Sequence, residues 1–146
     1  MSNQNDALRK TVASSGAVLF ALGMLTGLWS AIALTGKVKV GIPHLALAAH
    51  LNALFGGLWL IALAFTMPML SYGEAAKRRL FLATLVPAYA NWLVTVLASF
   101  LGVAGLDYTG DHANDAVAFL LQATVVLPSL VATEAWAWGF RAGAPR

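Results

Sequence analysis

Hydrophobic and polar positions along this chain fall into long blocks. Four apolar segments cover residues 12–35, 45–70, 79–105 and 114–140, and short stretches rich in glycine, proline and charge separate them. At a rise of about 1.5 Å per residue, each segment can cross roughly 30 Å of hydrocarbon as an α-helix. The pattern predicts an all-α integral membrane protein, a four-transmembrane-helix bundle with one domain over residues 1–146.

Composition and charge support a membrane location. The chain is 60% hydrophobic and 10% charged, whereas a soluble domain carries roughly 25% charged residues. The chain has no cysteine, which excludes disulfides and thiolate metal sites. Its net charge of +3 is spread over short loops and tails with no basic helix face, so nucleic acid is not an expected partner. The first apolar run is too long for a signal peptide, and we expect a retained helix.

The distribution of basic residues predicts the orientation. Only Lys37 and Lys39 lie on the side of the acidic third loop. The positive-inside rule then places both termini in the cytoplasm, for a multi-pass protein of a bacterial inner membrane. The other basic residues all fall on the cytoplasmic side: Arg9, Lys10, Lys77, Arg78, Arg79, Arg141 and Arg146.

Polar residues inside the spans are the first candidates for function, because burying them in a bilayer is costly. The second segment carries His50 and Asn52. Polar and small residues share one face of each of the last two segments, and we expect both faces to turn inward. They are Thr84, Ala88, Asn91, Thr95, Ser99 and Gly102 in the third segment, and Ala118, Gln122, Ser129 and Thr133 in the fourth.

Small residues recur at helical spacing on the first two segments. Gly23 and Gly27 form a GxxxG motif, and Ala49, Ala53 and Gly57 form a ladder beside His50. Such positions let two helix backbones approach closely. They could equally leave room for a flat ligand or for a second subunit. Four short helices enclose little volume, so we consider a site shared between subunits.

His50 and Asn91 each have two interpretations. A neutral imidazole can bind a metal, and haem iron often takes one axial histidine; a core histidine can instead donate a hydrogen bond between helices. Asn91 can orient a substrate or bond to another helix, and Tyr89 and Trp92 beside it can wall a substrate or simply pack. No spacing of His or Asp residues predicts a zinc site.

Two blocks of residues suggest a family. The segment from His50 to Pro68, HLNALFGGLWLIALAFTMP, and the later Tyr89-Ala-Asn91-Trp92-Leu resemble the hydroxylaminobenzene mutases. Those proteins look related to the styrene oxide isomerases, four-helix membrane proteins in which a histidine matching His50 holds haem b between the subunits of a trimer. The resemblance implies a homotrimer with haem b at its subunit interfaces, His50 as the iron ligand, and Ala49, Ala53 and Gly57 beside the porphyrin.

The chain also departs from the isomerase pattern. Gly56 stands where the family usually has an asparagine, Thr95 where the isomerases carry a catalytic tyrosine, and Pro87 where they carry an aspartate. Asn52 replaces an expected acidic residue, whereas Asn91 matches in both groups. The differences at Gly56, Thr95 and Pro87 favour the mutase branch, whereas Asn52 departs from the residue expected in that branch as well.

The expected function is therefore a haem b-dependent isomerase. It would convert small apolar arylhydroxylamines, such as hydroxylaminobenzene, to 2-aminophenols, with the iron as Lewis acid and Asn91, Tyr89 and Asn52 as catalytic residues. One alternative is an epoxide-to-aldehyde isomerase resembling styrene oxide isomerase. Others are a cytochrome b-type electron carrier, and a non-catalytic membrane protein or small transporter without a cofactor.

Overall fold

The structure is a computed structural model that describes residues 2–141. It contains four helices long and apolar enough to cross a membrane. They are α1 (Ser2–Leu34), α2 (Pro43–Thr66) with a 3₁₀ turn η1 (Met67–Met69), α3 (Glu74–Leu101), and a fourth span made of α4 (His112–Leu120), a π-helical segment η2 (Leu121–Val126) and α5 (Leu127–Gly139). The prediction of a four-span, all-helical membrane protein is confirmed.

Local chemistry sets most of the helix ends. Pro43 starts α2, where a missing N–H costs nothing. Gly102 ends α3 in a left-handed conformation with φ of 72°, so this helix stops before the expected residue 105. Asp111 caps α4 by accepting a hydrogen bond from the Asn114 N–H at 2.8 Å. α1 begins well before the expected residue 12, because its polar first turns continue the helix beyond the apolar run.

Pro68 exposes a helix carbonyl that a basic side chain satisfies. A proline has no N–H, so the Ala64 carbonyl four residues earlier lacks its usual donor. The Arg9 Nε group of α1 lies 3.4 Å from that oxygen. A cation at the C-terminal end of α2 also interacts favourably with the helix dipole.

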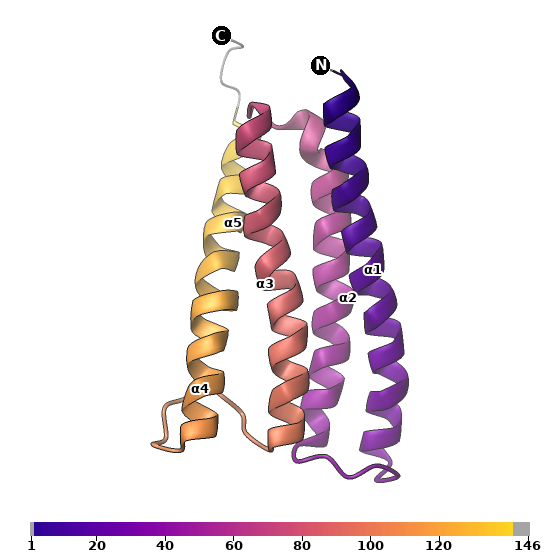
Figure 1. The fold of residues 1–146 in the computed structure, drawn as a ribbon, viewed down its shortest axis with the longest axis vertical. Helices are drawn as coiled ribbons and strands as arrows, with labels where there is room; N and C mark the ends of the chain where they lie inside the picture. The colour runs from indigo at the N-terminus through magenta and orange to yellow at the C-terminus, as the bar shows by residue number, and fades with distance from the viewer. Residues whose placement is uncertain (1, 142–146) are drawn as a thin grey trace.

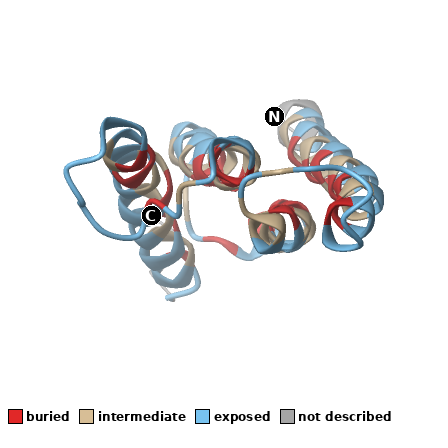
Figure 2. Ribbon diagram, turned by 90° about the horizontal axis from the view of Figure 1, so that it is seen from below, coloured by how far each residue is buried: buried red, intermediate tan, exposed pale blue. Residues whose placement is uncertain are grey.

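The four spans pack as a folded layer (Figures 1 and 2). α1 packs on α2, α2 on α3, and α3 on the fourth span, so that α1 and the fourth span lie at opposite ends of the layer. The loops after α1 and α3 lie at one end of the molecule, and the α2–α3 turn lies at the other with the start of α1.

Close backbone contact joins α1 to α2. A Cβ atom added to Gly57 would lie 2.8 Å from the Gly16 carbonyl oxygen and 2.9 Å from the Phe20 nitrogen. Leu19, Leu60 and Leu63 are fully buried in the cluster that continues toward α3. Larger side chains at the glycine positions would force the two helices apart.

Candidate functional site

His50 lies in the seam between α1 and α2. Its Nδ1 atom is 2.7 Å from the carbonyl oxygen of Gly23 on α1. A carbonyl oxygen can only accept a hydrogen bond, so Nδ1 carries the proton and donates it. The neutral imidazole then has its lone pair on Nε2. Metal-binding histidines usually fix their tautomer and ring orientation in this way.

The Nε2 atom of His50 is available to a ligand. It has no hydrogen-bond partner among residues 6–141, and the side chain is only half-buried. Gly27 supports the other side of the ring, because a Cβ atom there would lie 2.8 Å from both Cε1 and Nδ1. The sequence placed His50 as a metal ligand, and its donor chemistry fits one axial bond to haem iron.

The small-residue ladder packs helices together. Ala49 and Ala53 are fully buried, and Ala53 lies under Gly23, whose added Cβ would be 3.1 Å from the Ala53 Cβ. Gly57 lies directly against the α1 backbone. Ala53 and Gly57 thus contact α1 of the same subunit, and the expectation that Ala49, Ala53 and Gly57 line a porphyrin stays a prediction.

A second group of polar side chains joins α2 to α3. The Asn52 amide Nδ2 donates to Asn91 Oδ1 and to Thr95 Oγ1, each at 3.0 Å. Thr95 in turn donates to the Asn91 backbone carbonyl at 2.6 Å. Asn52 Nδ2 and the Thr95 hydroxyl thus have acceptors within the cluster, whereas the Asn91 amide nitrogen has no partner among the described side chains. The structure brings Asn52 and Asn91 together as the sequence suggested.

The Asn52–Asn91 pair borders a cavity of about 280 Å³ between α2, α3 and α5. An engineered protein cavity of about 150 Å³ accepts benzene, so the volume suits one substituted aromatic ring. The remaining walls are aromatic, small or hydroxyl-bearing, and none is ionisable. They come from Phe55, Gly56, Trp59, Pro87, Ala88 and Ser129.

The sequence analysis did not assign several of these lining residues to the site. Phe55 and Trp59 follow Asn52 at positions i+3 and i+7, which places all three on one helix face. That spacing was a usable signal. Ser129 was assigned to an inward stripe but not to the site, and only the fold shows that it faces Asn91 across the cavity.

Tyr89 and Trp92 point elsewhere. The Tyr89 hydroxyl donates to the Ser15 carbonyl on α1 at 2.9 Å, and Trp92 Nε1 donates to Thr26 Oγ1 on α1 at 2.9 Å. Neither side chain lines the cavity. Residues two apart on a helix face different sides, so Tyr89 ties α3 to α1, and the expectation that it acts as a catalytic residue beside Asn91 stays a prediction.

The expected stripe on the fourth span is also broken. Ala118 is buried, but Gln122 and Thr133 are exposed, and Gln122 accepts a hydrogen bond from Tyr108 in the outer loop at 3.3 Å. The π-helical segment Leu121–Val126 shifts the register between the two halves of the span. Pro128 directly beyond this segment supplies no N–H to a regular helical ladder.

His50 and the cavity lie on different sides of α2. His50 contacts α1, whereas Asn52 contacts α3, and a separation of two residues turns a helix by about 200°. One subunit thus holds an imidazole with a free nitrogen and, separately, a polar aromatic cavity. Residues 6–141 contain no cluster of three His, Asp or Glu side chains that could hold a metal ion without help.

Comparison with known proteins decides the family. The family model described as styrene oxide isomerase matches residues 8–141. The chain belongs to this family. It is 30% identical over 146 residues to hydroxylaminobenzene mutase HabB of Ectopseudomonas oleovorans, a match that covers 95% of this chain and 85% of HabB.

A second relative comes from the same organism. Hydroxylaminobenzene mutase HabA is 33% identical over 89 residues, which cover 61% of each protein. No solved structure matches this chain significantly. The family resemblance drawn from His50 to Pro68 and from Tyr89 to Trp92 is thus confirmed, and the chain is an isomerase or mutase with four membrane spans.

Proposed function

We propose that this isomerase uses haem b, held by His50, to convert arylhydroxylamines to 2-aminophenols within a bacterial inner membrane, with both termini in the cytoplasm. The observation that carries the cofactor assignment is the hydrogen bond from His50 Nδ1 to the Gly23 carbonyl, which leaves Nε2 free as a ligand. The substrate class rests on similarity to HabB over nearly the whole chain.

His50 and Gly27 would form the protein side of the haem site. The Gly23 carbonyl fixes the tautomer and orientation of the imidazole, and Gly27 leaves room for the ring. When bound through one histidine, haem supplies an iron with an open coordination position that can act as a Lewis acid. His44 lies six residues before His50 on the same helix, so the two imidazoles cannot bind one iron from opposite faces within a subunit, which argues against a bis-histidine electron carrier.

The cavity between α2, α3 and α5 suits the substrate. Phe55 and Trp59 provide aromatic walls for the ring, and their π-faces stabilise positive charge that spreads into the ring as the N–O bond weakens. The Asn91 amide nitrogen can donate to the substrate oxygen, while Asn52 holds Asn91 in position through its Oδ1 atom. Asn52 therefore acts as a positioning residue.

The reaction needs no external oxidant or reductant. In going from hydroxylaminobenzene to 2-aminophenol, the N–O bond breaks and a C–O bond forms at the ortho carbon. That carbon loses a proton and the nitrogen gains one, so substrate and product are isomers. Because no ionisable side chain lines the cavity, its residues orient the substrate, and the protons move between the substrate and water.

A homotrimer would bring the two halves of the site together. His50 and the cavity open on different sides of α2, so the imidazole of one subunit can serve the cavity of its neighbour. The exposed apolar face of α2 offers a surface for this contact. Cyclic symmetry then repeats the same composite site around the ring.

Absorption spectra of the detergent-purified protein test the cofactor assignment. Expressed with a haem precursor, the wild type should show a Soret band nearly stoichiometric with subunits, and His50→Ala should lose it. His44→Ala, an exposed histidine on the same helix, is the matched control and should keep the band. A colourless wild type, or a His50→Ala variant that retains full absorbance, contradicts the assignment.

Co-expression of two inactive variants tests the shared site. His50→Ala and Asn91→Ala should each abolish turnover of hydroxylaminobenzene, and their mixture should recover activity in about a quarter of the sites of a random cyclic trimer. A chain with both substitutions, mixed with wild type, controls for subunit exchange. If the two-variant mixture stays inactive although the subunits exchange, each subunit uses its own His50 and the composite site is wrong.

Epoxide isomerisation is the second candidate, because the matching family is described by styrene oxide isomerase. The cavity wall carries Gly56 and Pro87 instead of the polar residues of the isomerase pattern, which removes groups that would orient an epoxide. Turnover of styrene oxide and hydroxylaminobenzene should be measured side by side. Faster conversion of styrene oxide to an aldehyde would reverse the assignment of the substrate.

A further inference from the structure

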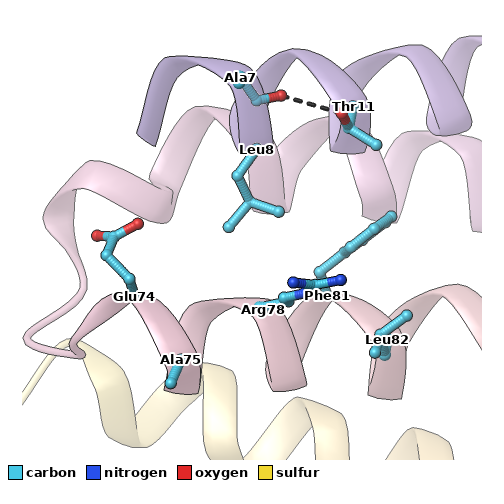
Figure 3. A pocket seen from close by; sticks show the side chains of 8 residues that line it. All are labelled: Ala7, Leu8, Thr11, Glu74, Ala75, Arg78, Phe81 and Leu82. Atoms are coloured by element: carbon cyan, nitrogen blue, oxygen red, sulfur yellow. Dashed lines mark hydrogen bonds between the residues drawn. The ribbon is translucent and has the colours of Figure 1, made fainter. Parts of the chain in front are cut away.

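A separate cavity of about 600 Å³ lies between the first turns of α1 and those of α3, at the end of the molecule away from the loop after α1 (Figure 3). Leu8 extends toward α3, and Arg78 and Phe81 extend toward α1. Leu82 continues the apolar wall toward the membrane interior. The volume is in the range of small-molecule sites and far exceeds that of a bound ion.

A hydrogen bond ties α1 to α3 farther along the two helices, toward the membrane interior. Tyr89 on α3 donates to the Ser15 carbonyl on α1 at 2.9 Å, one helical turn beyond Thr11 at the cavity wall. The cavity wall combines apolar side chains, among them Leu8, Phe81 and Leu82, with the charged Glu74 and Arg78.

Among the residues that line the cavity, Arg78 is the one with a basic side chain. It makes no salt bridge with the residues that the structure describes. Glu74 also lines the cavity, but its carboxylate lies 4.0 Å from the Lys77 ammonium, which offsets its charge. Five basic residues lie in these turns of α1 and α3 against two acidic ones: Arg9, Lys10, Lys77, Arg78 and Arg79 against Asp6 and Glu74.

We propose that this cavity binds one anionic phospholipid per subunit. Arg78 contacts the phosphate of the headgroup, and one acyl chain lies against Leu8, Phe81 and Leu82. A basic pocket between membrane helices at one face of the bilayer is the arrangement that recognises anionic headgroups. The apolar side chains in the cavity wall favour a lipid over a soluble phosphate. This site depends on neither the haem nor the reaction proposed above.

Native mass spectrometry of the intact protein, released from detergent in the presence of added lipid, tests the proposal. The wild type should retain one phosphatidylglycerol per subunit and little phosphatidylcholine. Arg78→Gln should weaken phosphatidylglycerol retention about five-fold, the value of one basic residue near a membrane surface. Arg79→Gln is the matched control: the same charge change on an adjacent exposed residue outside the cavity should alter retention less than two-fold.

Two further arms separate the sources of binding. Ala75→Leu adds apolar volume to the cavity wall without changing charge, and it should also reduce retention; it replaces Arg78→Gln if that variant does not fold. Glycerol phosphate carries the headgroup chemistry without acyl chains and should not displace the lipid. Equal losses for Arg78→Gln and Arg79→Gln, unchanged retention in Ala75→Leu, or displacement by glycerol phosphate would each overturn the proposal.

Discussion

The α1–α2 pair and the α3–α5 pair are built in opposite ways. Between α1 and α2, Gly16, Gly23 and Gly57 bring the two helices into close contact, and Gly27 lies against the His50 ring. The α3–α5 contact instead borders a cavity, which Ser129 of α5 lines together with residues of α2 and α3, Asn91 among them. The fourth span buries 22% of its apolar window, whereas α3 buries 39%, so the outer helix rests on α3 along a narrow strip.

The α1–α2 contact and the cavity beside α5 suit different parts of the proposed function. The rigid seam suits the metal-ligand role proposed for His50, because its ring is held by the Gly23 carbonyl on one side and by Gly27 on the other. A substrate cavity benefits from a looser wall that can admit aromatic molecules from the bilayer. The π-helical segment supplies irregular backbone at that wall, as such segments often do at functional sites.

Breaking the α1–α2 seam should have the largest effect. Gly57→Leu would press a branched side chain against the Gly16 carbonyl and the Phe20 backbone, so the helices must separate and the fold should lose several kcal/mol or fail to form. Gly73→Leu, at an exposed position with no atoms within 4 Å of its added Cβ, is the control. Thermal unfolding in detergent measures both. Similar melting temperatures for the two variants would show that the seam is not tight.

Gly27→Ala should affect haem binding by His50 more than it affects the stability of the fold. The added methyl group would lie 2.8 Å from two atoms of the imidazole, which must rotate and lengthen its bond to Gly23. We expect a lower haem stoichiometry with a shifted Soret band, and a modest loss of stability of about 1 kcal/mol. Met24→Ala, at an exposed site on the same helix, should leave the spectrum unchanged. An unaltered spectrum in Gly27→Ala would contradict the rigid-seam interpretation.

The sequence predicted the spans well because they depend on composition and length alone. Four uninterrupted apolar runs dictate four helices, and the structure changes only their ends, at the polar start of α1 and at Gly102. These ends depend on capping and on turns that continue beyond the apolar run. The Gly23–Gly27 motif and the ladder beside His50 were recognised as packing signals, and the fold shows which partner they contact.

The site was predicted less completely because it depends on which helix each face meets. His50, Asn52 and Asn91 stood out since polar groups are costly in a bilayer. Tyr89 was grouped with Asn91 through nearness in sequence, although two residues on a helix diverge by about 200°. Trp59 and Phe55 were overlooked among many apolar aromatics. Only the position of α5 reveals that they, Asn91 and Ser129 enclose one space.

Ser129 gives the smallest and most discriminating test of the looser pair. Its side chain borders the cavity opposite Asn91, and its hydroxyl makes no hydrogen bond among the residues described. Ser129→Ala should therefore raise KM for hydroxylaminobenzene about two- to five-fold, the value of one uncharged hydrogen bond, while haem content and kcat stay nearly constant. Thr133→Ala, one turn along the same helix but exposed, should change neither constant. A purely structural role for Ser129 would instead lower the thermal stability or the haem content of Ser129→Ala. Equal values of KM and kcat for Ser129→Ala and wild type would place the substrate outside the α2–α3–α5 cavity.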